Sequence, residues 1–485
     1  MLGALRRGAQ GGRVLVQAGP GEAVNYAQAL ARAGGFAQAL VRRGVRPGDR
    51  VAVQVEKAVE ALWLYLGCLR AGAVFLPLNP AYTWAETEYF LRDAEVALFV
   101  AEPARVAEAG HGVTLPALAA EAGEADFDDV PATGATLAAI LYTSGTTGRS
   151  KGVMLSRDNL ASNAAVLADV WAFTGDDVLL HVLPIFHTHG LFVATNTVLA
   201  AGASMIFLPA FGPDAVFAAL PRASVMMGVP THYTRLLSDA RLTAEAVAHV
   251  RLFISGSAPL SAVTHRDWAA RTGTAILERY GMTETNMNTS NPYAGERRAG
   301  TVGFALPGVE VRVCDPVTGA PLPRGEVGSI EVRGPNVFGG YWRMPEKTAA
   351  EFRADGFFIT GDMGAFDADG YLAILGRSKD LVITGGLNVY PAEVEGVIDD
   401  LPGVAASAVI GVPHPDFGEA VVAVVVPAAG ATLEEGRLRE ALRDRLAAFK
   451  IPKRVIVAAD LPRNAMGKVQ KNQLRASHGG LFTGG

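Results

Sequence analysis

The chain has 485 residues, too many for one ordinary hydrophobic core, so we expect at least two domains. Half of the residues are hydrophobic, and 43 basic side chains against 48 acidic ones leave a net charge of −5. This balance gives no electrostatic reason for a nucleic-acid or anionic-membrane partner. The two cysteines, Cys68 and Cys314, are too few for a disulfide framework. No apolar run approaches the roughly eighteen residues of a membrane span.

The N-terminal segment carries Arg6, Arg7 and Arg13 and no acidic residue before Glu22. This charge pattern is faintly like that of a transit peptide, but the segment is rich in glycine and has no clear amphipathic period. We therefore expect a frayed leader, ending before Tyr26, on a cytoplasmic protein.

Hydrophobic periodicity then predicts helices and strands in alternation. Apolar residues at helical spacing favour a helix over 26–43, and the stretch 50–55 alternates like a strand. A helix over 60–69 and a strand over 74–76 follow. Further strand-sized apolar runs lie at 97–101, 137–142, 205–208, 224–227 and 251–255. This order is typical of parallel sheets covered by helices, so the fold class is α/β.

The pattern changes after about Val302. Short alternating segments at 309–313 and 329–333, separated by Gly and Pro, indicate a small antiparallel or β-barrel-like subdomain. A compact piece then follows, with expected strands at 406–412 and 420–426 and a helix over 433–448. We place the domain boundary between residues 1–376 and residues 377–485.

The strongest chemical signal is the run Tyr142-Thr-Ser-Gly-Thr-Thr-Gly-Arg-Ser-Lys-Gly152, between an apolar strand and a helical stretch. Glycines let backbone N–H groups face phosphate oxygens, hydroxyls add donors, and a lysine adds charge. The spacing differs from the G-x-x-x-x-G-K-[ST] loop. A surface turn is the alternative reading, but the density of donors favours phosphate binding. The candidate residues are Thr143, Ser144, Gly145, Thr146, Thr147, Gly148 and Lys151.

This run resembles the first core motif of the adenylate-forming superfamily, which contains acyl-CoA synthetases, peptide-synthetase adenylation domains and luciferases. Further motifs similar to that family's follow in order between about residues 26 and 471. They are Leu183-Pro-Ile-Phe-His-Thr-His-Gly190, Ser255-Gly-Ser-Ala-Pro-Leu260, Arg279-Tyr-Gly-Met-Thr-Glu-Thr285, Thr360-Gly-Asp362 with Tyr371 to Gly376, Thr384-Gly-Gly-Leu-Asn-Val-Tyr-Pro391 and Pro462-Arg-Asn-Ala-Met-Gly-Lys468. Motifs of this length in this order leave little room for coincidence.

The resemblance implies a large N-terminal domain of helix-covered parallel sheets and a small mobile α+β C-terminal domain, hinged near Lys379. It also implies ATP, Mg²⁺ and coenzyme A as ligands. The implied nucleotide-binding residues are the phosphate loop above, Gly256, Ser257, Ala258, Pro259, Glu278, Arg279, Tyr280, Gly281, Met282, Thr283, Asp362 and Arg377. Thr143 and Glu284 would hold Mg²⁺. Asp362 and Arg377 would bind the ribose hydroxyls. Gly385 and Gly386 would contact the thiol acceptor.

Lys468, Glu284, Thr283 and His187 are the catalytic residues that the resemblance implies. The chemistry is consistent with these roles, because a carboxylate that attacks the α-phosphate of ATP brings two anions together. Magnesium on Glu284 and the ammonium of Lys468 would supply the positive charge. Because Lys468 lies far along the chain from the phosphate loop, a mobile domain would have to deliver it and then withdraw it before the thiol enters.

The acid is less explicit in the sequence. The pair His187 and His189 has no evident third metal ligand, so a pocket-lining role is the better reading. A dicarboxylic acid would need a buried arginine for its second carboxylate, and the candidates are Arg235, Arg279 and, more weakly, Arg298. Ser257 completes the expected substrate-binding set.

As a whole the chain is similar to the malonyl-CoA synthetase branch of the superfamily, which implies malonate, together with methylmalonate, as the acid. Several alternatives stay open: a ligase for another acid such as acetate, a fatty acid or an aromatic acid; an enzyme that loads a carrier protein; a luciferase-type oxygenase; and a non-enzymatic adenylate-binding regulator. Its expected partners are small molecules, and we expect a monomer or a homodimer.

Overall fold

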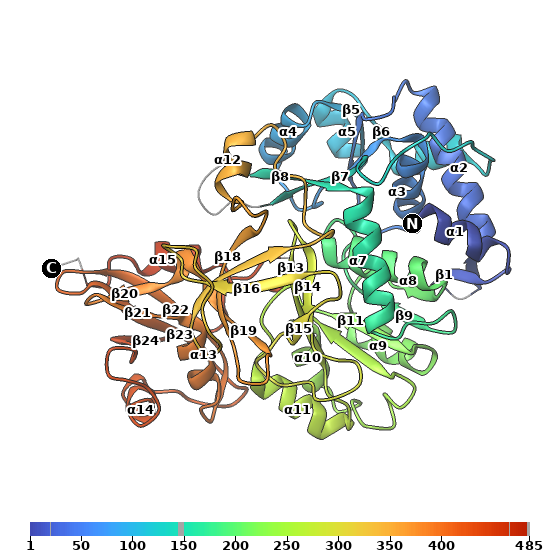
Figure 1. The fold of residues 1–485 in the computed structure, drawn as a ribbon. Helices are drawn as coiled ribbons and strands as arrows, with labels where there is room; N and C mark the ends of the chain where they lie inside the picture. The colour runs from blue at the N-terminus through green and yellow to red at the C-terminus, as the bar shows by residue number, and fades with distance from the viewer. Residues whose placement is uncertain (20, 144–149, 465, 483–485) are drawn as a thin grey trace.

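The computed structural model describes residues 1–19, 21–143, 150–464 and 466–482. Within them, two large sheets and two smaller ones are surrounded by helices (Figure 1). This is the multi-domain α/β architecture that the strand–helix alternation predicts.

The largest sheet holds the central strands of the molecule in the order β15-β14-β13-β12-β11-β9-β10-β1-β2. Its strands are β1 (Val14–Gly19), β2 (Glu22–Asn25), β9 (Val178–His181), β10 (Ser204–Phe207), β11 (Val225–Gly228), β12 (Leu252–Ser255), β13 (Leu277–Met282), β14 (Asn286–Ser290) and β15 (Phe304–Ala305). Strands β1, β10, β9, β11, β12 and β13 run parallel, and the edge pairs are antiparallel. A parallel arrangement places the carboxyl ends of these strands at one edge of the sheet.

A second sheet, in the order β6-β5-β3-β4-β7-β8, lies beside the first. Its strands are β3 (Arg50–Gln54), β4 (Val74–Pro77), β5 (Val96–Ala101), β6 (Val113–Thr114), β7 (Leu137–Thr143) and β8 (Lys151–Ser156). Strands β7 and β8 pair antiparallel, with Thr143 opposite Lys151. The phosphate-loop residues Ser144, Gly145, Thr146, Thr147 and Gly148 lie outside the described residues.

Helices cover these sheets and connect their strands. They are α1 (Leu2–Ala9), α2 (Tyr26–Arg42), α3 (Val59–Ala71), α4 (Trp84–Asp93), α5 (Pro103–Ala109), α6 (Leu115–Ala122), α7 (Arg157–Val170), α8 (Asn196–Ala201), α9 (Pro213–Ala219), α10 (Pro230–Leu237), α11 (Ala262–Thr272) and α12 (Pro345–Ala350), with the π-helix η1 (His189–Thr195) and the 3₁₀ turn η2 (Leu220–Arg222). The predicted helix at 26–43 is confirmed as α2. It begins at a capping box in which Asn25 and Gln28 bond to each other's backbone N–H groups.

The expected frayed leader is wrong. Helix α1 is ordered because Leu5 is fully buried in the main core and Arg6 forms an ion pair with Asp129 at 2.6 Å. The glycine content that suggested a loop instead allows close packing, since a side chain at Gly8 would collide with the ring of Tyr26.

The expected antiparallel subdomain is a four-stranded sheet in chain order. Its strands are β16 (Glu310–Cys314), β17 (Gly328–Arg333), β18 (Phe358–Phe366) and β19 (Leu372–Arg377). The proposed boundary at residues 376 and 377 falls at the end of β19 and stays a prediction.

The C-terminal sheet follows the 3₁₀ turn η3 (Ser378–Asp380) and has its own hydrophobic core. Its elements are β20 (Val382–Thr384), β21 (Leu387–Val389), α13 (Pro391–Asp399), β22 (Val404–His414), β23 (Gly418–Pro427), α14 (Glu435–Ala441), β24 (Arg454–Val457) and α15 (Lys471–His478). Helix α14 is much shorter than the predicted 433–448. Beyond Leu442 the chain forms short turns, and Arg443 and Arg445 face solvent.

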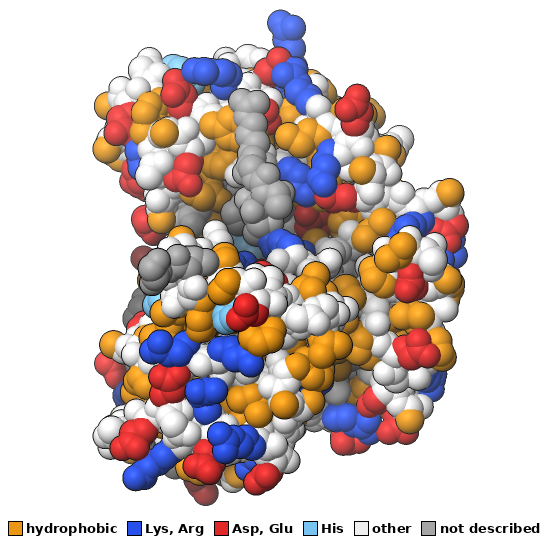
Figure 2. Space-filling view, turned by 90° about the vertical axis from the view of Figure 1, so that its left-hand side faces the viewer, with side chains coloured by type: hydrophobic (Ala, Val, Ile, Leu, Met, Phe, Trp, Pro, Cys, Tyr) orange, Lys and Arg blue, Asp and Glu red, His pale blue; other side chains and the backbone are white. Residues whose placement is uncertain are grey.

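In the described ranges, no helix is both long enough and apolar enough to cross a bilayer. Figure 2 shows basic, acidic and hydrophobic side chains interspersed over one face of the molecule. That face carries no single basic stripe of the kind that nucleic-acid binding produces.

Candidate active site

Four segments that carry predicted site residues lie at the carboxyl edge of the largest sheet. Strand β9 leads to the histidine segment, β11 to the start of α10, β12 to Gly256 and β13 to Thr283. In open α/β sheets, ligands bind outside the carboxyl ends of the strands. Segments that are far apart in the sequence are therefore neighbours at this edge.

The adenine segment after β12 has a strained turn. Ser257 has a φ of +72°, which is unusual for a residue with a side chain. Its hydroxyl lies 3.1 Å from Nδ1 of His189. Glu278 on β13 is buried and accepts a hydrogen bond from the Leu260 N–H at 3.0 Å. Burial raises the pKa of Glu278 to about 8, although that hydrogen bond and the neighbouring Arg279 oppose the shift.

The turn from β13 into β14 carries the rest of the expected nucleotide motif. Tyr280, Gly281 and Met282 belong to β13, and Thr283 follows it. A side chain at Gly281 would collide with the carbonyl oxygen of Asn286. This position therefore requires glycine.

The predicted ribose residues lie next to each other. Asp362 on β18 and Arg377 on β19 are cross-strand partners, and their side chains form an ion pair at 2.8 Å. The Tyr280 hydroxyl donates a hydrogen bond to the other Asp362 oxygen. Asp362 is buried, so its carboxylate is held in one orientation. A carboxylate with a neighbouring guanidinium suits a pair of adjacent hydroxyl groups.

Glu284 is the candidate magnesium ligand. It is buried, and burial raises its pKa in spite of the opposing influence of Arg377 and Lys151. Its Oε1 lies 3.1 Å from the Tyr341 hydroxyl, which also contacts Glu351 at 2.5 Å. One hydroxyl has a single proton and cannot donate to both carboxylates. Glu351 also accepts from Lys151 and Lys347 at 3.2 and 2.8 Å, so Glu284 is the carboxylate with fewer side-chain donors.

This arrangement fits magnesium, which is usually held by one or two carboxylates together with phosphate oxygens and water. Among the residues that the structure describes, no group of three or more His, Cys, Asp or Glu side chains could hold a metal by itself. Thr143, the second expected ligand, ends β7. Lys151 lies 3.2 Å from Glu351 and 4.0 Å from the centre of the Tyr341 ring, so it links the phosphate-loop hairpin to the carboxylate pair.

The C-terminal lysine motif reaches this site. Met466 is buried in the main hydrophobic core, and Gly467 packs against Thr231 at the start of α10. Lys468 follows. Desolvation by the surrounding protein lowers the pKa of its ammonium group, the charge of Arg377 lowers it further, and the charge of Asp362 raises it. The lysine is therefore within electrostatic reach of the ribose pair.

The expected hinge lies just before the C-terminal sheet, and the expected thiol loop lies within that sheet. Lys379 is in η3, and burial lowers its pKa to about 8. Gly385 and Gly386 form the turn between β20 and β21, both with positive φ, and Gly385 donates to the Phe417 carbonyl at 2.9 Å. Their roles as hinge and thiol contact stay predictions.

Two family models match most of the chain. The model of the AMP-binding enzymes matches residues 6–342, and the model of the AMP-binding enzyme C-terminal domain matches residues 393–468. The chain belongs to the AMP-binding enzymes. Its relatives include a feruloyl-CoA synthase from Amycolatopsis, 37% identical over 95% of both chains, and a malonate–CoA ligase from Arabidopsis thaliana, 35% identical over 90% of this chain and 79% of the relative. Among solved structures, ATP-bound MatB from Rhodopseudomonas palustris is 59% identical over 97% of both chains, with a TM-score of 0.94.

In this AMP-binding enzyme, the expected acid pocket combines two histidines with a buried arginine. His187 Nδ1 accepts a hydrogen bond from the His189 N–H at 3.2 Å. Burial, with a contribution from Arg279, lowers the pKa of His187 to about 4, so its imidazole is neutral and its Nε2–H is free to donate. Nε2 of His189 is buried and has no hydrogen-bond partner among the residues that the structure describes. Both rings therefore present polar atoms that the described protein does not satisfy.

Arg279 is the central cation of this pocket. It is buried, and its Nε and Nη2 atoms have no hydrogen-bond partner among the described residues. Burial lowers its pKa to about 10. The guanidinium lies over Gly256, where any side chain would overlap it. A charged group in this state needs an anion, because burying it unpaired costs several kcal/mol.

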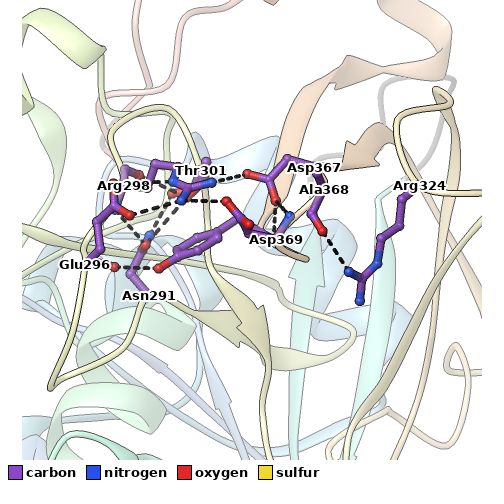
Figure 3. A network of polar contacts seen from close by, with 9 residues as sticks. Asn291, Glu296, Arg298, Thr301, Arg324, Asp367, Ala368 and Asp369 are labelled. Carbon is purple, nitrogen blue, oxygen red and sulfur yellow. Dashed lines mark hydrogen bonds and ion pairs between the residues drawn. The ribbon is translucent and has the colours of Figure 1, made fainter.

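The other two candidate arginines have different surroundings. Arg235 is exposed on α10, where its charge contributes to a lowered pKa of His232, after the larger effect of burial. Arg298 is engaged with the protein's own acids, Glu296, Asp367 and Asp369, at 2.5 to 3.0 Å (Figure 3). Arg298 is thus held in a structural ion cluster rather than in the acid pocket.

Two polar groups near the site were not expected from the sequence. Tyr341 and Glu351 join Glu284, and Lys57 contacts His181. No spacing indicated either group, because their members come from separate elements. From the sequence alone, a lysine such as Lys57 that lies outside any predicted helix or strand is expected to be a surface charge.

Proposed function

We propose that the chain is an AMP-forming acid–thiol ligase that converts malonate, ATP and coenzyme A to malonyl-CoA, AMP and diphosphate. Methylmalonate is the expected second acid. The carboxylate oxygen bonds to the α-phosphorus and diphosphate leaves. The thiol sulfur then bonds to the acyl carbon, loses its proton, and AMP leaves.

One observation carries the choice of acid: the guanidinium of Arg279 is buried, and two of its nitrogens have no partner among the described residues. A second carboxylate on the substrate would accept two parallel hydrogen bonds from such a group. The neutral His187 adds a donor, and the neutral His189 adds a polar ring nitrogen, so neither ring adds charge. A purely apolar acid would leave Arg279 unpaired, which argues against a fatty-acid tunnel.

The residues divide the work of the first step. Asp362 and Arg377 would orient the ribose, and Glu284 would hold magnesium, which supplies positive charge to the phosphate oxygens. The ammonium of Lys468 would stabilise charge that develops at the α-phosphate. For the second step Lys468 has to leave, and motion about Lys379 would bring Gly385 and Gly386 toward the thiol.

The relatives support a ligase reaction, but they differ in the acid that they use. The Arabidopsis relative is a malonate–CoA ligase, and the Amycolatopsis relative, at a slightly higher identity, is a feruloyl-CoA synthase. An aromatic acid is therefore the second candidate, although its apolar ring would not pair with Arg279. In our proposal the partners are these small molecules, and the enzyme works in the cytoplasm as a monomer or a homodimer.

The test measures AMP release with ATP, magnesium and coenzyme A across malonate, methylmalonate, succinate, acetate, octanoate and ferulate. We expect malonate to give the highest kcat/KM, and Arg279→Met to abolish the preference for a dicarboxylate. Equal activity of wild type and variant on ferulate or octanoate would support the ligase reaction but contradict malonate as the substrate. AMP release that does not require coenzyme A would instead point to another acceptor.

A further inference from the structure

Lys57 is a partly buried cation that the reaction above does not use. It lies between β3 and α3, and its Nζ donates to the His181 carbonyl at 2.8 Å and lies 3.0 Å from His181 Nδ1. The same Nζ lies 4.3 Å from the centre of the Phe207 ring. No carboxylate in the described part of the chain pairs with it, and burial alone lowers its pKa. Withdrawing a lysine even partly from water without a carboxylate partner is costly, so its position calls for an explanation.

The contacts of His181 fix its tautomer. Nε2 lies 2.9 Å from the Gly190 carbonyl, which can only accept, so Nε2 carries the proton. Burial and the Lys57 charge both lower the pKa of His181, so the ring is neutral. Nδ1 is then bare and accepts from Lys57. A hydrogen-bonded relay thus runs from Lys57 through His181 to the backbone of Gly190.

Gly190 belongs to the unusual helix η1. Its carbonyl also accepts from the Thr195 hydroxyl at 3.0 Å, so two side-chain donors meet at one oxygen inside this π-helix. A side chain at Gly190 would collide with the Pro184 carbonyl. π-Helical turns are rare and are often found at functional sites. The relay supplies donors at the point where the wide turn opens.

The first residue of η1 is His189, the histidine of the acid pocket. Its position is set by the adjacent Gly190 on one side and by the Ser257 hydroxyl, 3.1 Å from its Nδ1, on the other. Its Nε2, without a partner among the described atoms, is aimed at no protein group. Any shift of Gly190 would therefore move a buried imidazole whose Nε2 is left for a ligand by the described residues.

We propose that Lys57 and His181 are positioning residues that hold η1 open and so orient His189 for the acid substrate. Neither residue has to touch the substrate. They make the acid pocket rigid by donating to backbone atoms, and this rigidity sets the discrimination among acids. The substrate readouts rest on the proposed function, whereas the tautomer and the coupling of the rings do not.

The kinetic test compares Lys57→Met, His181→Gln and His181→Leu. Methionine keeps the length and the contact with Phe207 but cannot donate. Glutamine can still accept from Lys57 and donate to Gly190, whereas leucine can do neither. We expect Lys57→Met and His181→Leu to raise the KM for malonate about tenfold, the scale of one displaced hydrogen bond, and to leave the KM for ATP within about twofold. His181→Gln should restore most of the loss.

Tyr65→Phe is the matched control. It removes a buried hydrogen bond to Asn196, the residue directly after η1, without touching Gly190. The proposal predicts an unchanged malonate KM for this variant even if its unfolding temperature falls. Equal effects of Tyr65→Phe and Lys57→Met on both quantities would show a merely structural role and overturn the proposal.

An NMR experiment on ¹⁵N-histidine-labelled protein separates this proposal from the proposed function. Wild-type His181 should show the neutral Nε2–H tautomer, and Lys57→Met should shift the signals of both His181 and His189. Inactivity of the wild type on every acid would refute the ligase and leave this readout intact. Signals of His189 that ignore Lys57→Met would refute the relay, as would an Nδ1–H tautomer at His181. If Lys57→Met does not fold, the tautomer and the pair of His181 variants decide the question.

Discussion

Arg279 and Arg298 lie on neighbouring parts of the same chain and have opposite surroundings. Arg298 is partly exposed, holds three carboxylates and lies 4.2 Å from the centre of the Tyr371 ring. Arg279 is buried, with two nitrogens unpaired within the described structure. Arg298, which water can reach, is paired with carboxylates of the protein. Arg279, which water cannot reach, has no carboxylate partner in the described structure. This difference separates a structural cation from one that is kept for a ligand.

The largest expected effect is that of Arg279→Met. Loss of two charge-assisted hydrogen bonds, about 3 to 6 kcal/mol in all, should lower kcat/KM for malonate by about 10² to 10⁴. The free energy of unfolding should stay equal or rise, because an apolar side chain replaces an unpaired buried charge. Steady-state kinetics and urea unfolding on the same preparation check both. A marked loss of stability would mean that Arg279 is structural, like Arg298.

Arg279→Lys should have a smaller effect, because an ammonium keeps the charge but cannot form two parallel hydrogen bonds. We expect kcat/KM for malonate to fall about 10- to 100-fold, between wild type and Arg279→Met. Activity equal to that of wild type would show that the pocket needs only a positive charge to bind the second carboxylate.

Arg235→Ala should cost about tenfold in the KM for malonate, since an exposed arginine exchanges water for its ligand and contributes less than a buried one. Malonate titrations of this variant and of the double variant with Arg279→Met measure the coupling between the two cations. Full additivity would indicate that the two arginines do not share one carboxylate.

Glu278→Gln tests the buried neighbour of Arg279. Burial raises the folded-state pKa of Glu278 from its usual 4.5 to about 8. The stability it contributes is complete below pH 4.5 and is lost as the pH rises to 8, because only the unfolded state has then released the proton. The variant should flatten this part of the stability profile. Urea unfolding at pH 5, 6, 7 and 8 measures it, and parallel profiles would contradict the raised pKa.

Arg298→Met should have the smallest effect on activity. The acid cluster of Figure 3 loses its central cation, so the free energy of unfolding should fall slightly. The KM for malonate should not change, because Arg298 is bound to the protein's own acids. A raised malonate KM with an unchanged ATP KM would return Arg298 to the list of pocket residues.

Periodicity and motif order predicted the α/β fold, helix α2 and the segments that meet at the carboxyl edge of the sheet. They could not show which arginine is buried, because burial of Arg279 depends on Gly256, a residue on another strand's loop. The relay from Lys57 to Gly190 was equally invisible, since three separate elements contribute to it. The leader was misread because glycine permits either a loop or the close contact of Gly8 with Tyr26.

The guanidinium of Arg279 occupies the space that a side chain at Gly256 would need. The order in which these two positions change therefore matters in evolution and in engineering. A larger residue at 256 would push the guanidinium out of its place, whereas it would meet no such obstacle once a smaller residue stands at 279. The direct route toward apolar acids begins at Arg279, passes through an intermediate with an enlarged neutral pocket, and then refills that pocket from position 256.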